Sequence, residues 1–242
     1  MTAVIRYGIG MFIGLLACVS MADELPETIV IGTFPIPLMV ESEEKGIFIE
    51  LTQALAKEAG LNIQIRVFPA QRTLREFAAK RLDGLFPGLA VTMPVPYERT
   101  TSVYVKRDYA FTRKGEKPLH TVEQLAGKKV ALTSGYPYVE PLTSRQDIRF
   151  ELANSDEQNV KKLLAGRVDA FVVELKSGLK AFHADGRESA IQYDIAKPLS
   201  EQDVFYALQI GQHGEQLAQR LSQALERLKR SGRFDQIMAV TR

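Results

Sequence analysis

From residue 28 onward, short runs rich in β-branched residues alternate with segments whose apolar residues recur at helical spacing. This alternation is typical of βαβ units, in which parallel strands lie side by side and helices cover the sheet. The first unit reads as a strand over Ile29–Thr33, a helix over residues 48–59 that ends at Gly60, and a strand over residues 62–68. The alternation therefore predicts an α/β fold with a largely parallel sheet.

One six-residue segment occurs in two similar copies. Residues 81–86 read Arg-Leu-Asp-Gly-Leu-Phe, and residues 167–172, 86 positions later, read Arg-Val-Asp-Ala-Phe-Val. A helical pattern precedes each copy, and each copy continues as a strand. The matching order predicts two α/β lobes of similar plan. We expect Asp83 and Asp169 to have structural roles in which each bonds the turn that follows it.

The second half of the chain carries start signals for its helices. Thr121 and Ser155 each precede a glutamine by three residues, which is the pattern of a capping box. Strands are expected over Lys129–Thr133 and residues 148–152, and a further apolar run covers residues 204–210. The last helical segment carries on one face four leucines that we expect in the core: Leu217, Leu221, Leu225 and Leu228.

Composition and charge exclude several classes of protein. Lys and Arg number 31 and Asp and Glu 29, so the net charge of +2 argues against a nucleic-acid binder. A single cysteine excludes a disulfide framework and a cysteine-based zinc module. The sequence contains no Walker loop and no GxSxG motif, and its histidines (His120, His183 and His213) lack the spacing of metal ligands. We therefore expect no metal, no cofactor and no nucleic-acid partner.

The N-terminal segment reads as an export signal. Residues 7–22 carry no charge and follow Arg6, the only early cation. The stretch is shorter than the roughly 20 residues that span a membrane, and small residues near its end predict a signal peptide cut after Ala22. A second interpretation rests on Leu-Leu-Ala-Cys at residues 15–18, with Cys18 lipidated after cleavage. A third is an uncleaved anchor helix. Cleavage at either position exports the protein.

Five short segments occur in a characteristic order: Gly46-Ile-Phe-Ile-Glu50-Leu51, Arg81-Leu-Asp83-Gly, Pro96-Tyr97-Glu98-Arg99, Leu125-Ala-Gly127-Lys-Lys-Val130 and Gly166-Arg-Val-Asp169-Ala. In that order they resemble the family-3 extracellular solute-binding proteins, the periplasmic receptors of polar amino-acid ABC transporters. The resemblance implies a type II periplasmic binding protein fold, with a ligand cleft between two lobes. Lobe 1 would comprise residues 23–110 and 205–242, lobe 2 residues 111–204, and residues 1–22 the signal peptide.

The same resemblance implies the partners. The ligand would be a small polar solute, an amino acid or another carboxylate, and the receiving partner the membrane subunits of an ABC permease. The protein is expected to be a monomer in the periplasm, held at a membrane if Cys18 carries a lipid.

Arg99 and Glu174 are the main candidate ligand-binding residues. An arginine can direct two N–H donors at one carboxylate, and Arg99 matches the family arginine that binds the ligand carboxylate. Glu174 ends a predicted strand where the family commonly has an aspartate that pairs with the ligand ammonium. Compared with the family pattern, four extra residues, 93–96, lie between Thr92 and Tyr97. They affect how far the Arg99 side chain can reach toward the ligand.

Further candidates follow the ends of predicted strands in both lobes. The turn at Ser134, Gly135 and Tyr136 offers N–H groups and a hydroxyl for an anion. The resemblance implies that the aromatic side chains of Phe34 and Phe68 enclose the ligand and that the carbonyl of Gly88 approaches its amine. Core packing is the alternative for the two phenylalanines. Arg72, four residues after Phe68, is a candidate second cation or a surface residue at the start of a helix. Ala90 and Phe48 depart from the family pattern, which expects Thr and Asp there.

Three functional hypotheses follow. The first is an exported receptor that closes on its ligand by hinge motion and delivers it to a permease. The second is an enzyme on the same fold, similar to the periplasmic dehydratases of cyclic acids, in which Glu174 acts as a general acid. The third is a module that binds ligand and signals to a separate membrane receptor.

Overall fold

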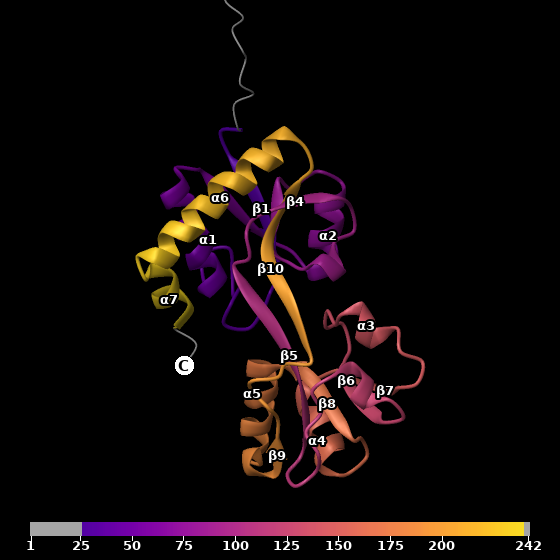
Figure 1. The fold of residues 1–242 in the computed structure, drawn as a ribbon. Coiled ribbons are helices and arrows are strands. Elements are labelled where there is room, and N and C mark those ends of the chain that lie inside the picture. The colour runs from indigo at the N-terminus through magenta and orange to yellow at the C-terminus, as the bar shows by residue number, and fades with distance from the viewer. Residues whose placement is uncertain (1–25, 240–242) are drawn as a thin grey trace, which may run out of the picture.

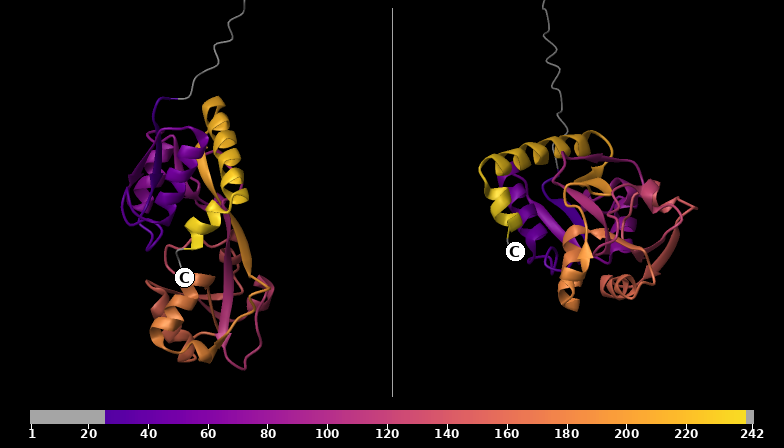
Figure 2. Two further views of the ribbon diagram at one scale, coloured as in Figure 1. Left: turned by 90° about the vertical axis from the view of Figure 1, so that its left-hand side faces the viewer. Right: turned by 60° about the horizontal axis from the view of Figure 1, so that its bottom comes forward.

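Two ten-residue strands, β5 (Tyr104–Arg113) and β10 (Ser200–Gln209), run side by side through the middle of the molecule (Figure 1). In this computed structural model, which describes residues 26–239, the two strands pair antiparallel from Tyr104–Val204 to Asp108–Ser200. Beyond that paired segment, β10 continues into one lobe and β5 continues into the other. The left view of Figure 2 shows both strands passing between the lobes.

Lobe 1 contains a small parallel sheet closed by the end of β10. The strand β1 pairs parallel with β2 and β3, and β10 pairs antiparallel with β3 and β4. The elements of this lobe are β1 (Ile29–Thr33), α1 (Ile47–Ala59), β2 (Ile63–Val67), α2 (Ala70–Ala78), β3 (Gly84–Gly88), β4 (Tyr97–Arg99), α6 (Gln212–Arg230) and α7 (Arg233–Met238).

Lobe 2 has the corresponding arrangement around β5. The strand β6 pairs parallel with β7 and β8, and β5 pairs antiparallel with β8 and β9. The elements of this lobe are β6 (Lys129–Thr133), α3 (Glu140–Thr143), β7 (Arg149–Ala153), α4 (Asp156–Leu164), β8 (Ala170–Glu174), α5 (Leu175–Asp185) and β9 (Ile191–Gln192). All ten strands form one continuous sheet. The predicted α/β fold class is confirmed, since each lobe has a mostly parallel sheet flanked by helices.

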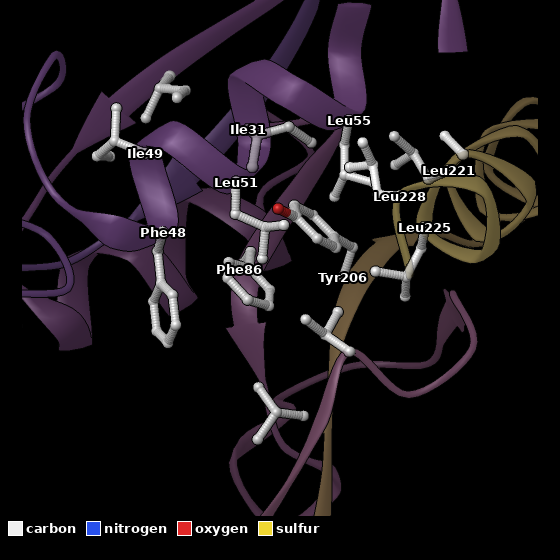
Figure 3. Close-up of a cluster of buried hydrophobic side chains, with 14 of the residues drawn as sticks. Ile31, Phe48, Ile49, Leu51, Leu55, Phe86, Tyr206, Leu221, Leu225 and Leu228 are labelled. Carbon is white, nitrogen blue, oxygen red and sulfur yellow. The ribbon is translucent and has the colours of Figure 1, made fainter. Parts of the chain in front are cut away.

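The core of lobe 1 lies between its sheet and helices α1 and α6. The ring of Tyr206 stacks on Phe86 at 4.1 Å between ring centroids (Figure 3). The Tyr206 hydroxyl lies 2.7 Å from Thr52 Oγ1. Burial raises the pKa of Tyr206. The four leucines of α6 are buried in this core, as the sequence predicts (Figure 3 labels Leu221, Leu225 and Leu228).

The two copies of the repeated segment make the same backbone contacts. Asp83 Oδ2 accepts from the amide of Val30 at 2.7 Å, and Asp169 Oδ2 accepts from the amide of Lys129 at 2.8 Å. In return, the amide of each aspartate donates to the carbonyl of the same partner. Both aspartates are structural, but the expected bond to the following turn is wrong. Each aspartate instead fixes the start of the neighbouring parallel strand.

The two long strands also end in equivalent contacts. Gln209, at the end of β10, donates from Nε2 to the carbonyls of Phe77 and Leu82 at 2.8 Å each. At the end of β5, Arg113 donates from Nη1 to two carbonyls that lie 86 positions further along the chain, those of Leu163 at 2.7 Å and Val168 at 2.6 Å. The duplication visible in the sequence therefore includes the way in which each long strand is attached to its lobe.

The predicted signal peptide (residues 1–22) and Cys18 lie outside the described residues. Within residues 26–239, no helix combines the length and the apolar character needed to cross a membrane.

We predict that Asp83→Ala lowers the free energy of unfolding by about 1–3 kcal/mol, because the amide of Val30 loses its acceptor. Asp169→Ala should do the same in lobe 2. Asp83→Asn keeps an oxygen in place and is the matched control. Urea denaturation followed by circular dichroism measures the difference, and equal midpoints for the Ala and Asn variants would contradict the prediction.

Candidate ligand-binding site

The parallel strands of both lobes point their carboxyl ends at the region between the lobes. Gly88, at the end of β3, lies opposite Phe205 of β10. Glu174, at the end of β8, lies opposite Asp108 of β5, and Asp108 in turn lies opposite Ser200 of β10. Ser200 and Phe205 are five residues apart, or about 17 Å along a strand. Ligands of open α/β sheets bind at the carboxyl ends of the strands, so this region is the candidate site.

Arg99 lies at the end of β4, opposite Ala207 of β10. Its guanidinium carbon is 5.2 Å from the centre of the Phe205 ring, and Nη1 is 3.5 Å from Asp203 Oδ2. Its side chain is 49% exposed and the Asp203 side chain 43% exposed. An ion pair this exposed adds little stability, so the guanidinium remains available to a competing carboxylate.

The four extra residues 93–96, which precede β4, do not displace this strand from the sheet. Met93 and Val95 pack against the apolar cluster that includes Phe77 and Phe205. Tyr97 stacks on Phe205 at 5.4 Å between ring centroids. Arg99 therefore lies beside the strand that connects the two lobes.

Glu174 is both the last residue of β8 and the residue that caps helix α5. Its Oε2 accepts from the amide of Ser177 at 3.0 Å, which satisfies one of the free N–H groups at the helix start. The same carboxylate acts on two tyrosines: burial raises the pKa of Tyr104 and of Tyr136, and the negative charge of Glu174 raises both further. Glu174 thus has a structural role and also contributes negative charge to the lobe 2 side of the site.

The turn after β6 comprises Ser134, Gly135 and Tyr136, which were expected to donate hydrogen bonds to an anion. The amides of Ser134 and Tyr136 are already bonded to the carbonyls of Ala153 and Thr133. Within the described chain, the amide of Gly135 has no acceptor, and the Ser134 side chain is exposed. The part of this turn that can donate to an anion is therefore smaller than the sequence suggests.

Tyr136 itself is held in place by its hydroxyl, which donates to Asp156 Oδ2 at 3.0 Å. Asp156 is buried and also accepts from Thr133 Oγ1 at 2.5 Å. Asp156 raises the pKa of Tyr136, after burial as the main cause. The exposed ring of Tyr136 is therefore fixed at the lobe 2 border of the site.

The remaining candidates lie at strand ends of lobe 1. Phe34 directly follows β1 and Phe68 directly follows β2, and both are half-buried. Arg72 lies over the Phe68 ring, 4.6 Å from its centre. Packing also favours a glycine at position 88, because a Cβ atom there would lie 3.0 Å from the Phe205 carbonyl oxygen. The structure thus joins Phe68 to Arg72 directly.

The candidates form two groups on opposite sides of the paired strands. Within residues 26–239, no hydrogen bond or ion pair joins the lobe 1 residue Arg99 to the lobe 2 residue Glu174. A molecule that contacts both groups must lie between the lobes or draw them together.

Sequence reasoning missed the polar residues where β5 pairs with β10. Lys106 Nζ lies 2.5 Å from Asp108 Oδ1, and Ser200 donates to Asp108 Oδ2 at 3.0 Å. Next to them, Gln202 donates to the carbonyl of Pro137 at 2.8 Å. The period-two spacing of Lys106 and Asp108 is a strand signal, but the partner strand lies more than ninety positions away in the sequence.

The family profile of the bacterial extracellular solute-binding proteins, family 3, matches residues 29–240. The chain belongs to this family, and the two-lobed architecture is its periplasmic binding protein fold. No curated protein matches the chain.

Solved structures of several functional classes are similar to the chain. A histidine kinase sensor domain with similarity to periplasmic binding proteins shares 24% identity over 88% of this chain and 94% of its own, with a TM-score of 0.66. An ancestral arginine-binding protein bound to arginine shares 19% identity over 88% and 97%, with a TM-score of 0.62. The GluR0 ligand-binding core from Nostoc punctiforme, in complex with L-glutamate, shares 18% identity over 86% and 96%, with a TM-score of 0.64. At these identities the likeness establishes the fold.

We predict that Glu174→Ala lowers the free energy of unfolding by about 0.5–2 kcal/mol, because helix α5 loses its cap. Glu174→Gln keeps an oxygen for the Ser177 amide and should lie closer to the unchanged protein. Thermal unfolding of the two variants checks this. The capping role is refuted if the Ala variant unfolds at the same temperature as the Gln variant.

Proposed function

We propose that this protein is an exported receptor that captures a small polar solute, an amino acid or a related carboxylate, between its lobes and delivers it to an ABC permease. The observation that carries the proposal is the placement of Arg99 and Glu174. They lie at strand ends of different lobes, on either side of the paired segment of β5 and β10. A cation on one lobe and an anion on the other match the two charges of a zwitterion.

The chemistry of capture follows from these groups. The ligand carboxylate takes the place of Asp203 beside the Arg99 guanidinium, which can offer two parallel N–H donors. The ligand ammonium bonds the Glu174 oxygen that the Ser177 amide does not use. The aromatic rings of Phe34, Phe68 and Tyr136 border the space for the ligand side chain.

Closure requires the lobes to move as units about β5 and β10. The bond from Ser200 of β10 to Asp108 of β5 holds the two strands together on the lobe 2 side, and Lys106 pairs with the same carboxylate within β5. Rotation is then expected in the backbone that leads from this segment into lobe 1, as in hinge closure of other two-lobed proteins.

We predict that at least one free amino acid or small carboxylic acid from a panel binds with a measurable heat by calorimetry. Arg99→Met should weaken this binding roughly 10- to 100-fold, because a charge-assisted hydrogen bond to the carboxylate is lost. Glu174→Gln should weaken the binding of an amino acid while the helix cap remains. Asp203→Asn is the matched control and should change affinity by less than about threefold, because its exposed ion pair is weak.

The receptor hypothesis loses its basis if no member of the panel binds, or if Arg99→Met binds like the unchanged protein. Mass spectrometry of the molecule that copurifies with the exported protein supplies the first ligand to test. Transfer of that ligand to a reconstituted permease, with stimulation of its ATPase activity, tests delivery. Incubation with prephenate or arogenate should yield no product, and turnover of either would identify an enzyme instead.

We also predict that the ligand decreases the radius of gyration measured by small-angle X-ray scattering, because closure brings the lobes together. The Arg99→Met variant at the same ligand concentration should retain the larger value. An unchanged radius at saturating ligand would refute hinge closure.

A further inference from the structure

One face of β5 carries a row of polar side chains in the segment that connects the lobes. Side chains alternate between the two faces of a strand, so Tyr104, Lys106 and Asp108 share one face. Residues directly opposite each other in antiparallel strands also share a face, which adds Glu174 of β8, the partner of Asp108. We call these four residues the polar row.

The polar row extends from one lobe to the other. The ring of Tyr104 lies 5.9 Å from the ring of Phe48, which belongs to the lobe 1 core. Two residues further along β5, Lys106 Nζ lies 5.9 Å from the centre of the Tyr138 ring, which belongs to lobe 2. Tyr104 and Lys106 therefore lie between the groups that the two lobes contribute to the candidate site.

The hydroxyl of Tyr104 is the first feature that points to a ligand. Within residues 26–239 it has no hydrogen-bond partner. Burial raises the pKa of Tyr104, and the negative charge of Glu174 raises it further, so the hydroxyl oxygen is enclosed and close to the candidate site. The hydroxyls of four other tyrosines all have protein partners: Tyr109, Tyr136, Tyr138 and Tyr206.

The Tyr104 hydroxyl can also be reached from the solvent. The hydroxyls of Thr33 and Thr112 lack partners too, but those atoms are sealed within the lobes. Tyr104 is only half-buried, and its hydroxyl is not among the sealed atoms. Since an enclosed hydroxyl without a partner is unfavourable, a polar group of a ligand would stabilise it.

The ammonium of Lys106 is the second feature. Its side chain is 11% exposed, and its one acceptor within the described residues is Asp108 Oδ1. The other oxygen of Asp108 accepts from Ser200. Because an ammonium group has three N–H donors, Lys106 retains donors for a ligand while Asp108 balances its charge.

The order of groups along the polar row selects a ligand. Glu174 accepts hydrogen bonds, whereas Lys106 and Tyr104 have donors to offer. Tyr104 is four residues, or about 14 Å along a strand, from the residue opposite Glu174, so a molecule as long as an amino acid fits over Lys106. A cationic side chain would be repelled by Lys106, and an aliphatic one would leave both donors without a partner.

We propose that Tyr104 and Lys106 are specificity-determining residues, and that the ligand is an amino acid whose side chain ends in a carboxylate or carboxamide oxygen. The oxygen accepts from the Tyr104 hydroxyl and the Lys106 ammonium, while Glu174 accepts from the ligand ammonium. This assignment rests on the receptor function proposed above and narrows its ligand.

The first test compares amino acids by isothermal titration calorimetry. L-glutamate, L-glutamine, L-aspartate and L-asparagine form one set, and L-arginine, L-lysine and L-leucine form the other. We expect the amino acid that binds most tightly to belong to the first set. Tightest binding by a member of the second set, with Arg99→Met still weakened, overturns this assignment and leaves the receptor function intact. If none of the seven binds, both fail.

The second test removes the hydroxyl alone. Tyr104→Phe should weaken binding of the tightest amino acid about 3- to 10-fold, the effect of one hydrogen bond. The unfolding temperature of the ligand-free variant should be unchanged, because no bond within the protein is lost. Tyr206→Phe is the matched control: it loses the bond to Thr52, so it should unfold earlier and bind normally. Unaltered binding by Tyr104→Phe, or equal weakening in both variants, overturns the assignment.

The third test removes the charge of Lys106. Lys106→Met is combined with Asp108→Asn, so that no buried carboxylate is left without its partner. The double variant should discriminate at least tenfold less between the tightest amino acid and L-arginine. Unchanged discrimination contradicts the role of Lys106. If the double variant does not fold, the amino-acid comparison and Tyr104→Phe decide.

Discussion

The antiparallel pairing of β5 with β10 is the constraint on which the rest of the structure depends. Five residue pairs, from Tyr104–Val204 to Asp108–Ser200, make one sheet out of two lobes. Because β10 continues beside β3 and β5 continues beside β8, the parallel strands of both lobes end toward this segment. The position of the candidate site is thus a consequence of strand pairing, and the loops that follow the strands supply its chemistry.

The internal duplication explains why both lobes present their loops in the same way. Asp83 and Asp169 fix the starts of equivalent strands, and Gln209 and Arg113 attach the two long strands to equivalent carbonyls. The lobes differ in what covers the sheet. Helices α1 and α6 cover one face of the lobe 1 sheet, whereas the corresponding face of lobe 2 has only the four-residue helix α3 and a 3-10 turn. The shared framework fixes the geometry of the strand ends, whereas the covering of the two sheets differs.

Local patterns in the sequence predicted the local elements well. The strand over Ile29–Thr33 and the buried leucine face of α6 follow from residue periodicity, which neighbouring residues determine. Contacts between residues far apart in the sequence could not be predicted from these local patterns. The partner of Asp83 lies 53 positions away, and the carboxylate next to Arg99 lies on a strand 104 positions away. The capping box at Thr121 is present, yet it opens only a 3-10 turn, because a capping motif fixes where a helix starts and not how far it extends. The candidate site was thus predictable as a set of residue types at strand ends, but not as a set of contacts.

The place of β10 in the sheet has a consequence for the order in which the chain can fold. This strand lies between β3 and β5, so lobe 1 lacks its closing strand until residues 200–209 are available, and the core beneath α6 waits for residues 212–230. Lobe 2 has no such requirement for most of its sheet, because β5 to β8 are contiguous in the chain. Contacts between distant segments form slowly. A ribosome that releases the chain from its N-terminus therefore delivers the first part of lobe 1 early and its completion last, so that the strands β5 to β8 of lobe 2 can pair before the sheet of lobe 1 is closed.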